Sequence, residues 1–360
     1  MCDELINKIT FSILMRNDLR NAHALLATSA TATQALASLS ATHLDKLSIA
    51  HELALKELDF IEKHAIKTYF FGDADYPFRL SQCADAPLML YAKGNANTNP
   101  QHVVSIVGTR TPSERGKDWC RRLVLDLADQ VPNLTIVSGL AYGIDVVAHK
   151  AALESGIPTI IIPAHGLDRI YPSVHRSIAV QALSNGGILT EYVHGTEPER
   201  YHFVARNRIV AGLADAIVVV ESKAKGGSLI TAQMAIDYGR DVFALPGRYN
   251  DVSSEGCNNL IKRNQAQLIT DAVDLVQAMR WEIQKKDAVQ TNLLDQFCNL
   301  SPIQRSLLDI LVAEEDGIHV NQLVVKLQLP YNEVVSELMM MELQGIIKGM
   351  PGGIWRKIEK

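Results

Sequence analysis

Turns that combine glycine with cationic side chains mark the places in this sequence where chemistry can occur. The apolar run 103–107 ends at Gly108 and is followed at once by Thr109, Arg110 and a short polar turn to Ser113. A strand that ends in glycine where a helix begins exposes backbone N–H groups, and these bind anions. The guanidinium of Arg110 adds a permanent charge and a planar pair of donors that suit phosphate. The pattern predicts a phosphate contact at this strand end.

A second glycine turn of the same kind follows the apolar run 134–138. It consists of Ser138, Gly139, Leu140, Ala141, Tyr142 and Gly143. Two such turns in one αβ unit indicate a phosphate-bearing ligand and leave open whether it is a nucleotide or a nucleic acid. Asp145 and His149 stand four residues apart in the helix expected next. We expect them to form a structural hydrogen-bonded pair rather than an acid–base dyad.

Four further polar clusters lie at or near predicted strand ends or helix starts. They are residues 167–176, which include Arg176; 203–213, which include Arg206, Asn207 and Arg208; 221–232, which include Lys225, Gly226, Gly227 and Ser228; and 244–248. Ligands of open parallel sheets gather at the carboxyl ends of the strands, so these cations can converge there with Arg110. Arg206 and Arg208 point to different sides of one helix or turn. For each of them a structural salt bridge and a ligand contact stay open.

Catalytic and metal-binding patterns are missing from the sequence. The histidines at 165, 175, 194 and 202 lack metal-ligand spacing, and Gly-x-Ser-x-Gly does not occur. The five cysteines are scattered without a CxxC pair, which is typical of a reducing cytoplasm and of neither a disulfide framework nor a zinc site. We expect no metal, no cofactor and no activated nucleophile.

Composition excludes two classes of protein. A net charge of −5 over 360 residues excludes a broadly basic nucleic-acid coat protein, so a nucleic-acid site must be a local patch. No stretch reaches 18 consecutive apolar residues, and the acidic start at 1–4 lacks the layout of a signal peptide. We expect a cytoplasmic protein without a membrane span, built from two or three domains.

The elements that must position these turns alternate between strands and helices from residue 101 to 280. Apolar strands are expected at 103–107, 134–138, 158–162, 187–191, 216–220, 242–245 and 267–269. Helical periodicity separates them, for example at 117–128, 146–154 and 229–238. Strands that are apolar on both faces and joined by helices predict a doubly wound, mostly parallel sheet in an α/β domain.

The flanking segments have different patterns. Residues 1–65 are rich in Ala and Leu with helical spacing and predict a small helical domain, with a helix-hairpin-helix or SAM-like module as the best interpretation. Residues 66–100 form a connector with two short strands, at 68–71 and 87–91, and 281–300 form a polar linker. Residues 301–360 begin with Ser-Pro, typical of a helix start, and predict three helices and a hairpin, as in a winged helix-turn-helix.

Eight motifs together resemble those of one family, the DNA-processing protein A (DprA/Smf) family. They are VGTRTPS, SGLAYGIDVVAH, GLDRIYPSVHR, ILTEY, FVARNRIVAGLADAIVVVE, KGGSLITAQMA, GRDVFALPG and GCNNLIKRNQA, between about residues 75 and 280. The resemblance implies an extended Rossmann-like domain that binds single-stranded DNA without catalysis and forms a dimer. It also implies that the protein protects incoming DNA and loads RecA recombinase on it during natural transformation.

The same resemblance assigns roles to individual positions. Arg110 matches the arginine of the family's G-[ST]-R motif, residues 138–143 match its second backbone nest, 206–208 match its RNR element and 225–228 its pre-helix loop. Residues 163–166 replace the usual glycine-rich run. Ser173 and Val174 stand where many members carry a basic residue, a charge that Arg176 can supply.

Two other functions stay open. The sheet type is similar to that of lysine-decarboxylase-like phosphoribohydrolases, nucleotide-binding enzymes with a PGGxGTxxE loop, but Gln233 stands here in place of the catalytic glutamate. A DNA-binding regulator led by the tail is the third hypothesis. The helix expected at 331–344 is acidic and apolar, which favours a protein contact over phosphate binding. For single strands, the aromatic rings at 142, 171 and 203 offer stacking surfaces.

Overall fold

The computed structural model describes residues 2–39, 45–283, 300–313, 317–344, 346–350 and 352–357. The chain divides into two compact units, Met1–Gln284 and Lys285–Lys360. The predicted linker at 281–300 lies, from 284 to 299, outside the described residues.

A nine-stranded sheet forms the centre of the first unit. Its strands are β1 (Lys67–Phe70), β2 (Met89–Gly94), β3 (His102–Gly108), β4 (Leu134–Ser138), β5 (Thr159–Ile161), β6 (Gly186–Thr190), β7 (Ala216–Val220), β8 (Asp241–Ala244) and β9 (Gln267–Leu268). The order across the sheet is β1-β2-β6-β5-β4-β3-β7-β8-β9. The strands from β3 to β9 run parallel, and β1 and β2 are antiparallel to their neighbours.

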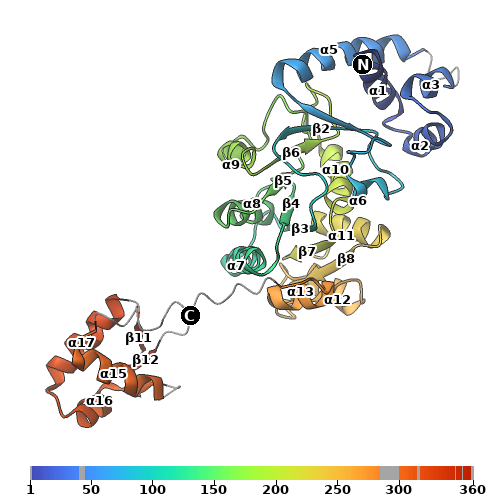
Figure 1. The fold of residues 1–360 in the computed structure, drawn as a ribbon. Helices are drawn as coiled ribbons and strands as arrows, with labels where there is room; N and C mark the ends of the chain where they lie inside the picture. Colours follow the sequence, from blue (N-terminus) through green and yellow to red (C-terminus); the bar gives the residue numbers. More distant parts are fainter. Residues whose placement is uncertain are drawn as a thin grey trace. The chain divides into compact units, whose positions relative to one another are not determined.

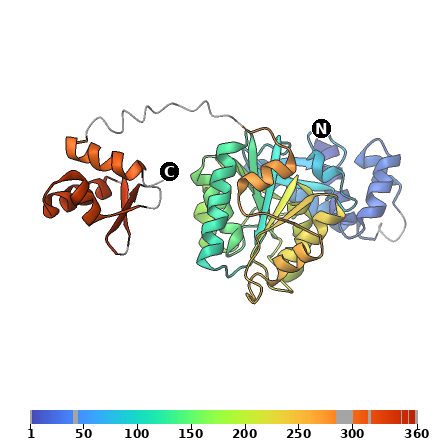
Figure 2. The ribbon, with the colours of Figure 1, turned by 90° about the horizontal axis from the view of Figure 1, so that it is seen from below.

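Helices cover both faces of this sheet (Figures 1 and 2). One face carries α7 (Glu114–Gln130), α8 (Ile144–Glu154), α9 (Arg176–Ala182) and α13 (Ala272–Met279); the other carries α6 (Phe78–Ser81), α10 (Arg200–Gly212), α11 (Gly227–Asp237) and α12 (Glu255–Lys262). Alternate residues of β3 enter the two cores: Val104 and Ile106 pack with α7 and α8, and Val103 and Val107 with α10 and α11. The doubly wound, mostly parallel sheet expected from apolar strands is confirmed.

Residues 66–100 contribute more to the sheet than a connector does. β1 and β2 extend it beyond β6, because β2 pairs with β6 from Tyr91 opposite Thr190 to Gly94 opposite Gly187. The two short strands that the sequence predicts are therefore edge strands of the central sheet.

The N-terminal segment folds as a group of helices packed on that edge. It comprises α1 (Cys2–Met15), α2 (Leu19–Thr28), α3 (Ala32–Ala37) and α5 (Leu47–His64). Ile9 and Phe11 of α1 share a core with Phe70 and Tyr91 of the sheet. Lys8 forms an ion pair of 2.7 Å with Asp73 just after β1. The helices are thereby fixed to the side of the sheet remote from β7.

The second unit is a winged helix. Helices α15 (Pro302–Ala313), α16 (Val320–Leu327) and α17 (Tyr331–Leu343) accompany the strands β10 (Ile318–His319), β11 (Ile347–Met350) and β12 (Ile354–Lys357). The strands form an antiparallel sheet in the order β10-β12-β11. Leu307, Leu323, Leu338 and Ile347 are fully buried in its core.

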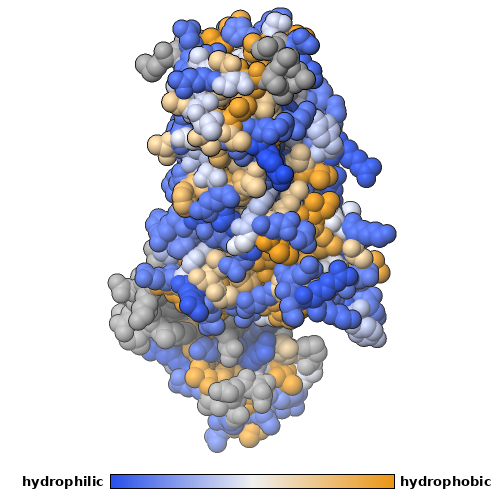
Figure 3. Space-filling model, turned by 90° about the vertical axis from the view of Figure 1, so that its right-hand side faces the viewer, coloured by the Kyte–Doolittle hydropathy of each residue, from blue (hydrophilic) through white to orange (hydrophobic). Residues whose placement is uncertain are grey.

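On the face drawn in Figure 3, hydrophilic side chains predominate and apolar ones form smaller groups between them. Within the described parts of the chain, no helix is at once long enough and apolar enough to span a bilayer.

Candidate nucleic-acid interface

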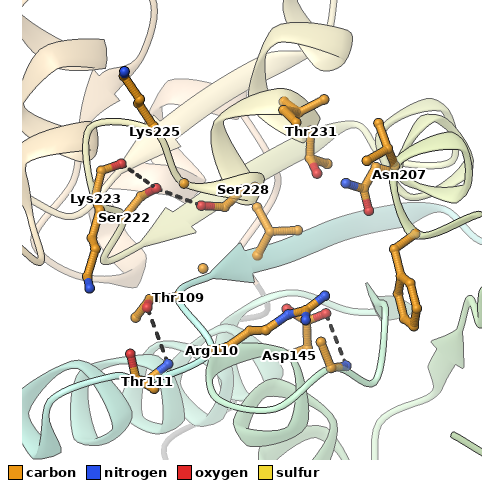
Figure 4. Close-up of a pocket in the computed structure, with 18 of the residues that line it drawn as sticks. Thr109, Arg110, Thr111, Asp145, Asn207, Ser222, Lys223, Lys225, Ser228 and Thr231 are labelled. Carbon is orange, nitrogen blue, oxygen red and sulfur yellow. Dashed lines mark hydrogen bonds between the residues drawn. The ribbon is translucent and has the colours of Figure 1, made fainter. Parts of the chain in front are cut away.

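A pocket of about 370 Å³ opens at the carboxyl ends of β3 and β7 (Figure 4). β3 lies between β4 and β7, so the chain winds outward from it in both directions, and the strand order reverses at this point. Open α/β sheets bind their ligands at such a switch point. The lining comes from the turn after β3, the turn after β4 with the start of α8, helix α10, and the loop from β7 into α11 with the first turns of that helix.

The turn after β3 is anchored at both ends. A Cβ on Gly108 would lie 2.0 Å from the Val220 carbonyl oxygen, so only glycine allows β3 and β7 to approach this closely. The Thr109 amide donates to the Glu221 carbonyl at 2.8 Å. The Ser113 amide and hydroxyl both donate to the buried Glu221 carboxylate, and the Ser113 oxygen caps α7 by accepting from the Gly116 amide. Ser113 thus positions the turn and does not line the pocket.

Arg110 is the exposed cation of this turn. Its guanidinium carbon lies 5.5 Å from the centre of the Phe203 ring, and in Figure 4 the side chain lies beside Asp145. Among the described residues it forms no ion pair, so its donors are available to a ligand. Phe203 in turn meets the half-exposed ring of Tyr171 edge-on at 5.9 Å.

The turn after β4 does not form the open anion nest that the sequence predicts. The amides of Gly139 and Ala141 both donate to Oδ2 of Asp145, at 3.2 and 3.3 Å, so a carboxylate of the same chain fills the nest. The Ser138 hydroxyl donates to the Ile106 carbonyl, and Leu140 is buried.

Only Ala141 of the residues from 138 to 143 lines the pocket. Gly143, at φ 82°, ends the turn where a side chain would strike the Thr109 carbonyl. Tyr142 is half exposed and packs edge-on against the ring of His175.

The predicted pair of Asp145 and His149 is wrong. The His149 Nδ1 lies 2.7 Å from the Thr159 hydroxyl, and the carboxylate of Asp145 is occupied by amides of its own turn. Burial lowers the pKa of His149 to about 3, so the ring is neutral at pH 7. It is a structural group of the core.

Arg206 lies at the inner end of the pocket. It is 3% exposed, and a Cβ on Gly139 would come within 1.6 Å of its Nη1, so the guanidinium lies directly against that glycine. Its Nε has no hydrogen-bond partner among the described residues. Burial lowers the pKa of Arg206, and the nearby Asp145 carboxylate opposes that shift. The inner end of the pocket thus holds a buried guanidinium with a donor that no described group uses.

Arg208, two residues further along α10, serves a different purpose. Its guanidinium pairs with the buried Glu191 carboxylate and donates to the Asp85 carbonyl, and it does not line the pocket. Residues two apart on a helix project about 200° apart, so the two arginines face opposite sides. We therefore reassign Arg208 from ligand contact to structural ion pair. Asn207, between them, does line the pocket.

The loop from β7 supplies two lysines and a helix start. Lys223 and Lys225 are exposed, line the pocket and extend in different directions from the loop (Figure 4). Gly226 is the N-cap of α11, and Gly226, Gly227 and Ser228 line the pocket. A Cβ on Gly227 would meet open space, so the first turn of α11 borders the pocket without a side chain in the way. The Ser228 hydroxyl donates to Ser222 at 2.9 Å. Arg176, at the start of α9, is exposed but is not part of this lining.

Four cationic side chains and one carboxylate thus meet around one pocket. Lys223 and Thr231 also line the pocket, although neither is among the binding residues predicted from the sequence. Both lie in the polar cluster 221–232, which was the signal in the sequence that could have identified them. The carboxylate is that of Asp145; burial raises its pKa, while Arg206 and the two amide hydrogen bonds act in the opposite direction. Among the described residues no group of three potential metal ligands occurs. The arrangement suits an anionic ligand.

Comparison with known proteins gives two matching family models. The model described as DNA recombination-mediator protein A matches residues 67–280, and the DprA winged helix domain matches 297–353. DNA processing protein DprA of Streptococcus pneumoniae is 41% identical over 204 residues, which cover 57% of this chain and 71% of that protein. Protein Smf of Synechocystis is 34% identical over 332 residues, 83% of this chain and 82% of its own. Protein Smf of Escherichia coli is 35% identical over 285 residues, 78% and 75%.

Solved structures agree with this assignment. DprA of Streptococcus pneumoniae superposes with a TM-score of 0.57 and 36% identity, covering 66% of this chain and 82% of that one. DNA processing protein A of Helicobacter pylori, whose structure concerns its single-stranded DNA binding mode, gives 0.54 and 31%, covering 60% and 95%. With the switch-point pocket, the winged helix and these relatives in hand, we conclude that the chain belongs to the DprA/Smf family of DNA recombination-mediator proteins.

Proposed function

We propose that this protein binds single-stranded DNA at the switch-point pocket without catalysing a reaction on it. The observation that carries the proposal is the convergence of Arg110, Arg206, Lys223 and Lys225 with the first turn of α11 around one pocket. Phosphate contacts of this kind position a strand without reading its bases. The Helicobacter pylori relative, described by its single-stranded DNA binding mode, supports the choice of ligand.

The neighbourhood of the pocket suits single strands rather than duplex. The rings of Tyr142 and Tyr171 are 49% and 47% exposed, and Phe203 lies between Tyr171 and Arg110. An aromatic ring exposed beside phosphate-binding groups stacks on an unpaired base and contributes about 1–3 kcal/mol per base. A base inside a duplex is stacked on both faces by its neighbours, so an aromatic side chain cannot stack on it.

The finer role is an inference that family membership supports. We infer a cytoplasmic protein that acts as a homodimer, protects incoming strands and loads RecA recombinase on them during transformation or recombination. A chain whose net charge is −5 and whose cations gather at one site suits a protein that holds a strand and then releases it to a partner.

The second candidate is a nucleotide hydrolase of the phosphoribohydrolase type. The pocket favours it in one respect, because Asp145 places a buried carboxyl of raised pKa beside Arg110. Two observations oppose it. The Asp145 oxygen already accepts two amide hydrogen bonds, and Gln233, which stands at the position of the catalytic glutamate, is exposed and donates to Asp237. Release of free base from a nucleoside monophosphate distinguishes the two functions.

Crosslinking tests the proposed function directly. A photoreactive thymidine oligonucleotide is bound to the full chain, and the attached peptides are mapped by mass spectrometry. We expect them to come from 108–113, 203–207 and 222–231. Peptides only from the winged helix at 301–357 contradict the proposal and support a function led by the tail.

A further inference from the structure

Asp145 places a negative charge where the pocket is otherwise cationic. It is the only acidic side chain among the lining residues, and it is 8% exposed. Its Oδ2 accepts hydrogen bonds from the amides of Gly139 and Ala141. Those amides belong to a strand-end turn at the sheet's carboxyl edge, where Rossmann-like folds hold nucleotide phosphates.

The cations of the pocket fall into two layers. Arg110, Lys223 and Lys225 are exposed, and with the start of α11 we call them the rim. Arg206 and Asp145 are buried, and we call them the floor. On the floor the carboxylate attracts Arg206 and also offsets the charge of Arg110. Asp145 therefore stands where the phosphate of a bound nucleotide would otherwise complete the hydrogen bonds of the amides and of Arg206.

We propose, on the basis of the function proposed above, that Asp145 determines specificity by keeping free nucleotides and inorganic phosphate out of the floor. A terminal phosphate carries about −1.5 to −2 charges at neutral pH, whereas an internal phosphodiester carries one. The doubly charged group gains most from a deep cationic site and is repelled most by a fixed carboxylate there. The rim still binds the single charges along a strand.

This arrangement serves discrimination as well as affinity. A switch-point pocket with a helix start and four cations is also suited to mononucleotides, which compete with DNA in a cell. An uncompensated floor would bind them. The Asp145 carboxylate accepts the amide hydrogen bonds and repels the doubly charged phosphate of a free nucleotide. It also lowers the affinity of the pocket for every other anion, so specificity is gained through repulsion.

The test variant is Asp145→Asn. Both amides donate to one oxygen, so the single amide oxygen of asparagine can accept both hydrogen bonds while the charge is lost. Asp118→Asn, an exposed position on α7 outside the pocket lining, removes the same charge elsewhere and is the matched control. Affinities for dTMP, inorganic phosphate and an unphosphorylated thymidine oligomer of about 20 nucleotides are measured at one salt concentration.

We expect Asp145→Asn to bind dTMP at least about tenfold more tightly than the wild type and to lower the ratio of the dTMP to the strand dissociation constant by a similar factor. Asp118→Asn should leave both unchanged. An unchanged ratio in Asp145→Asn overturns the proposal. Asp145→Ser, which also frees the amides, should show the gain if the asparagine variant folds poorly.

The wild-type protein provides an independent test. Millimolar dTMP or a nucleoside triphosphate should not displace the bound strand, and displacement at concentrations near the strand's own dissociation constant overturns the role of Asp145. If the wild type binds no strand at all, the proposed function fails, yet the gain of dTMP binding in Asp145→Asn still decides this inference by itself.

Discussion

At the scale of single residues, the pocket separates groups that meet a ligand from groups that hold the pocket together. Arg110 is exposed and forms no ion pair among the described residues. Ser113 and Glu221, in contrast, hydrogen-bond to each other and so fix the turn that carries Arg110. Removal of Arg110 should therefore affect binding without affecting the fold.

Arg110→Ala should weaken binding of a thymidine oligonucleotide by about 1.5–3 kcal/mol, because a charge-assisted contact to phosphate is lost. Fluorescence anisotropy at fixed salt measures the change, and thermal unfolding confirms that the variant is folded. Arg122→Ala, at an exposed position of α7 outside the pocket, is the control and should bind as the wild type does. Equal losses in both variants would mean that Arg110 acts only through the total charge.

Two glycines of the site should respond differently to a methyl group. Gly139→Ala places a Cβ 1.6 Å from Nη1 of the buried Arg206 and should cost about 1–3 kcal/mol of unfolding free energy or more. Gly227→Ala meets open space at the first position of α11 and should change stability by less than about 1 kcal/mol. Urea denaturation compares the two. Similar stabilities would show that Arg206 does not lie against Gly139.

At the scale of elements, helix α10 contributes to both the pocket and a buried ion pair on its opposite face. Its Arg206 face lines the pocket, and its Arg208 face pairs with Glu191, which directly follows β6. Because the two faces belong to one rigid helix, the ion pair contributes to the orientation of the residues that reach the ligand.

Arg208→Met leaves the Glu191 carboxylate buried without its cation and should lower the unfolding free energy by about 3–5 kcal/mol. Strand affinity, measured at a temperature where the variant remains folded, should stay close to that of the wild type. A variant that unfolds normally but binds DNA poorly would instead place Arg208 in the binding site.

The strands and helices of the first unit were largely predictable because each strand is apolar on both faces. Val103, Val104, Ile106 and Val107 enter two different cores, and such runs are expected only in a covered parallel sheet. The edge position of β1 and β2 was not predictable, since pairing with β6 joins residues about a hundred positions apart. No local pattern encodes that choice of neighbour.

At the scale of the whole molecule, the pocket lies within residues 107–231, so the first unit holds the complete candidate site. In a protein with net charge −5, four cations gather at this pocket, so we expect the electrostatic part of the proposed strand binding to come mainly from this patch.

The salt dependence of binding should report how many phosphates the patch neutralises. With three or four phosphate contacts, the logarithm of the binding constant should fall with that of salt concentration at a slope of about −2 to −3, since each contact to a single strand contributes roughly −0.7. Arg110→Ala should reduce the slope by about one contact. Homopolymers of equal length should bind alike; strong discrimination among them contradicts recognition through the backbone.

The sequence by itself determined the parallel strands of the sheet, the helices between them and the placement of cationic turns at the strand ends, because periodicity and glycine act locally. Only the tertiary structure decided which of these polar groups are free to contact a ligand and which are paired within the protein. Asp145 accepts the amide hydrogen bonds of the turn after β4, and Glu221 accepts the hydrogen bond of Ser113. Glu191 forms an ion pair with Arg208, which is therefore not available to a ligand. A buried charge or amide pairs with a group that lies close to it in space. That group can belong to a distant part of the sequence, and local patterns do not indicate which part.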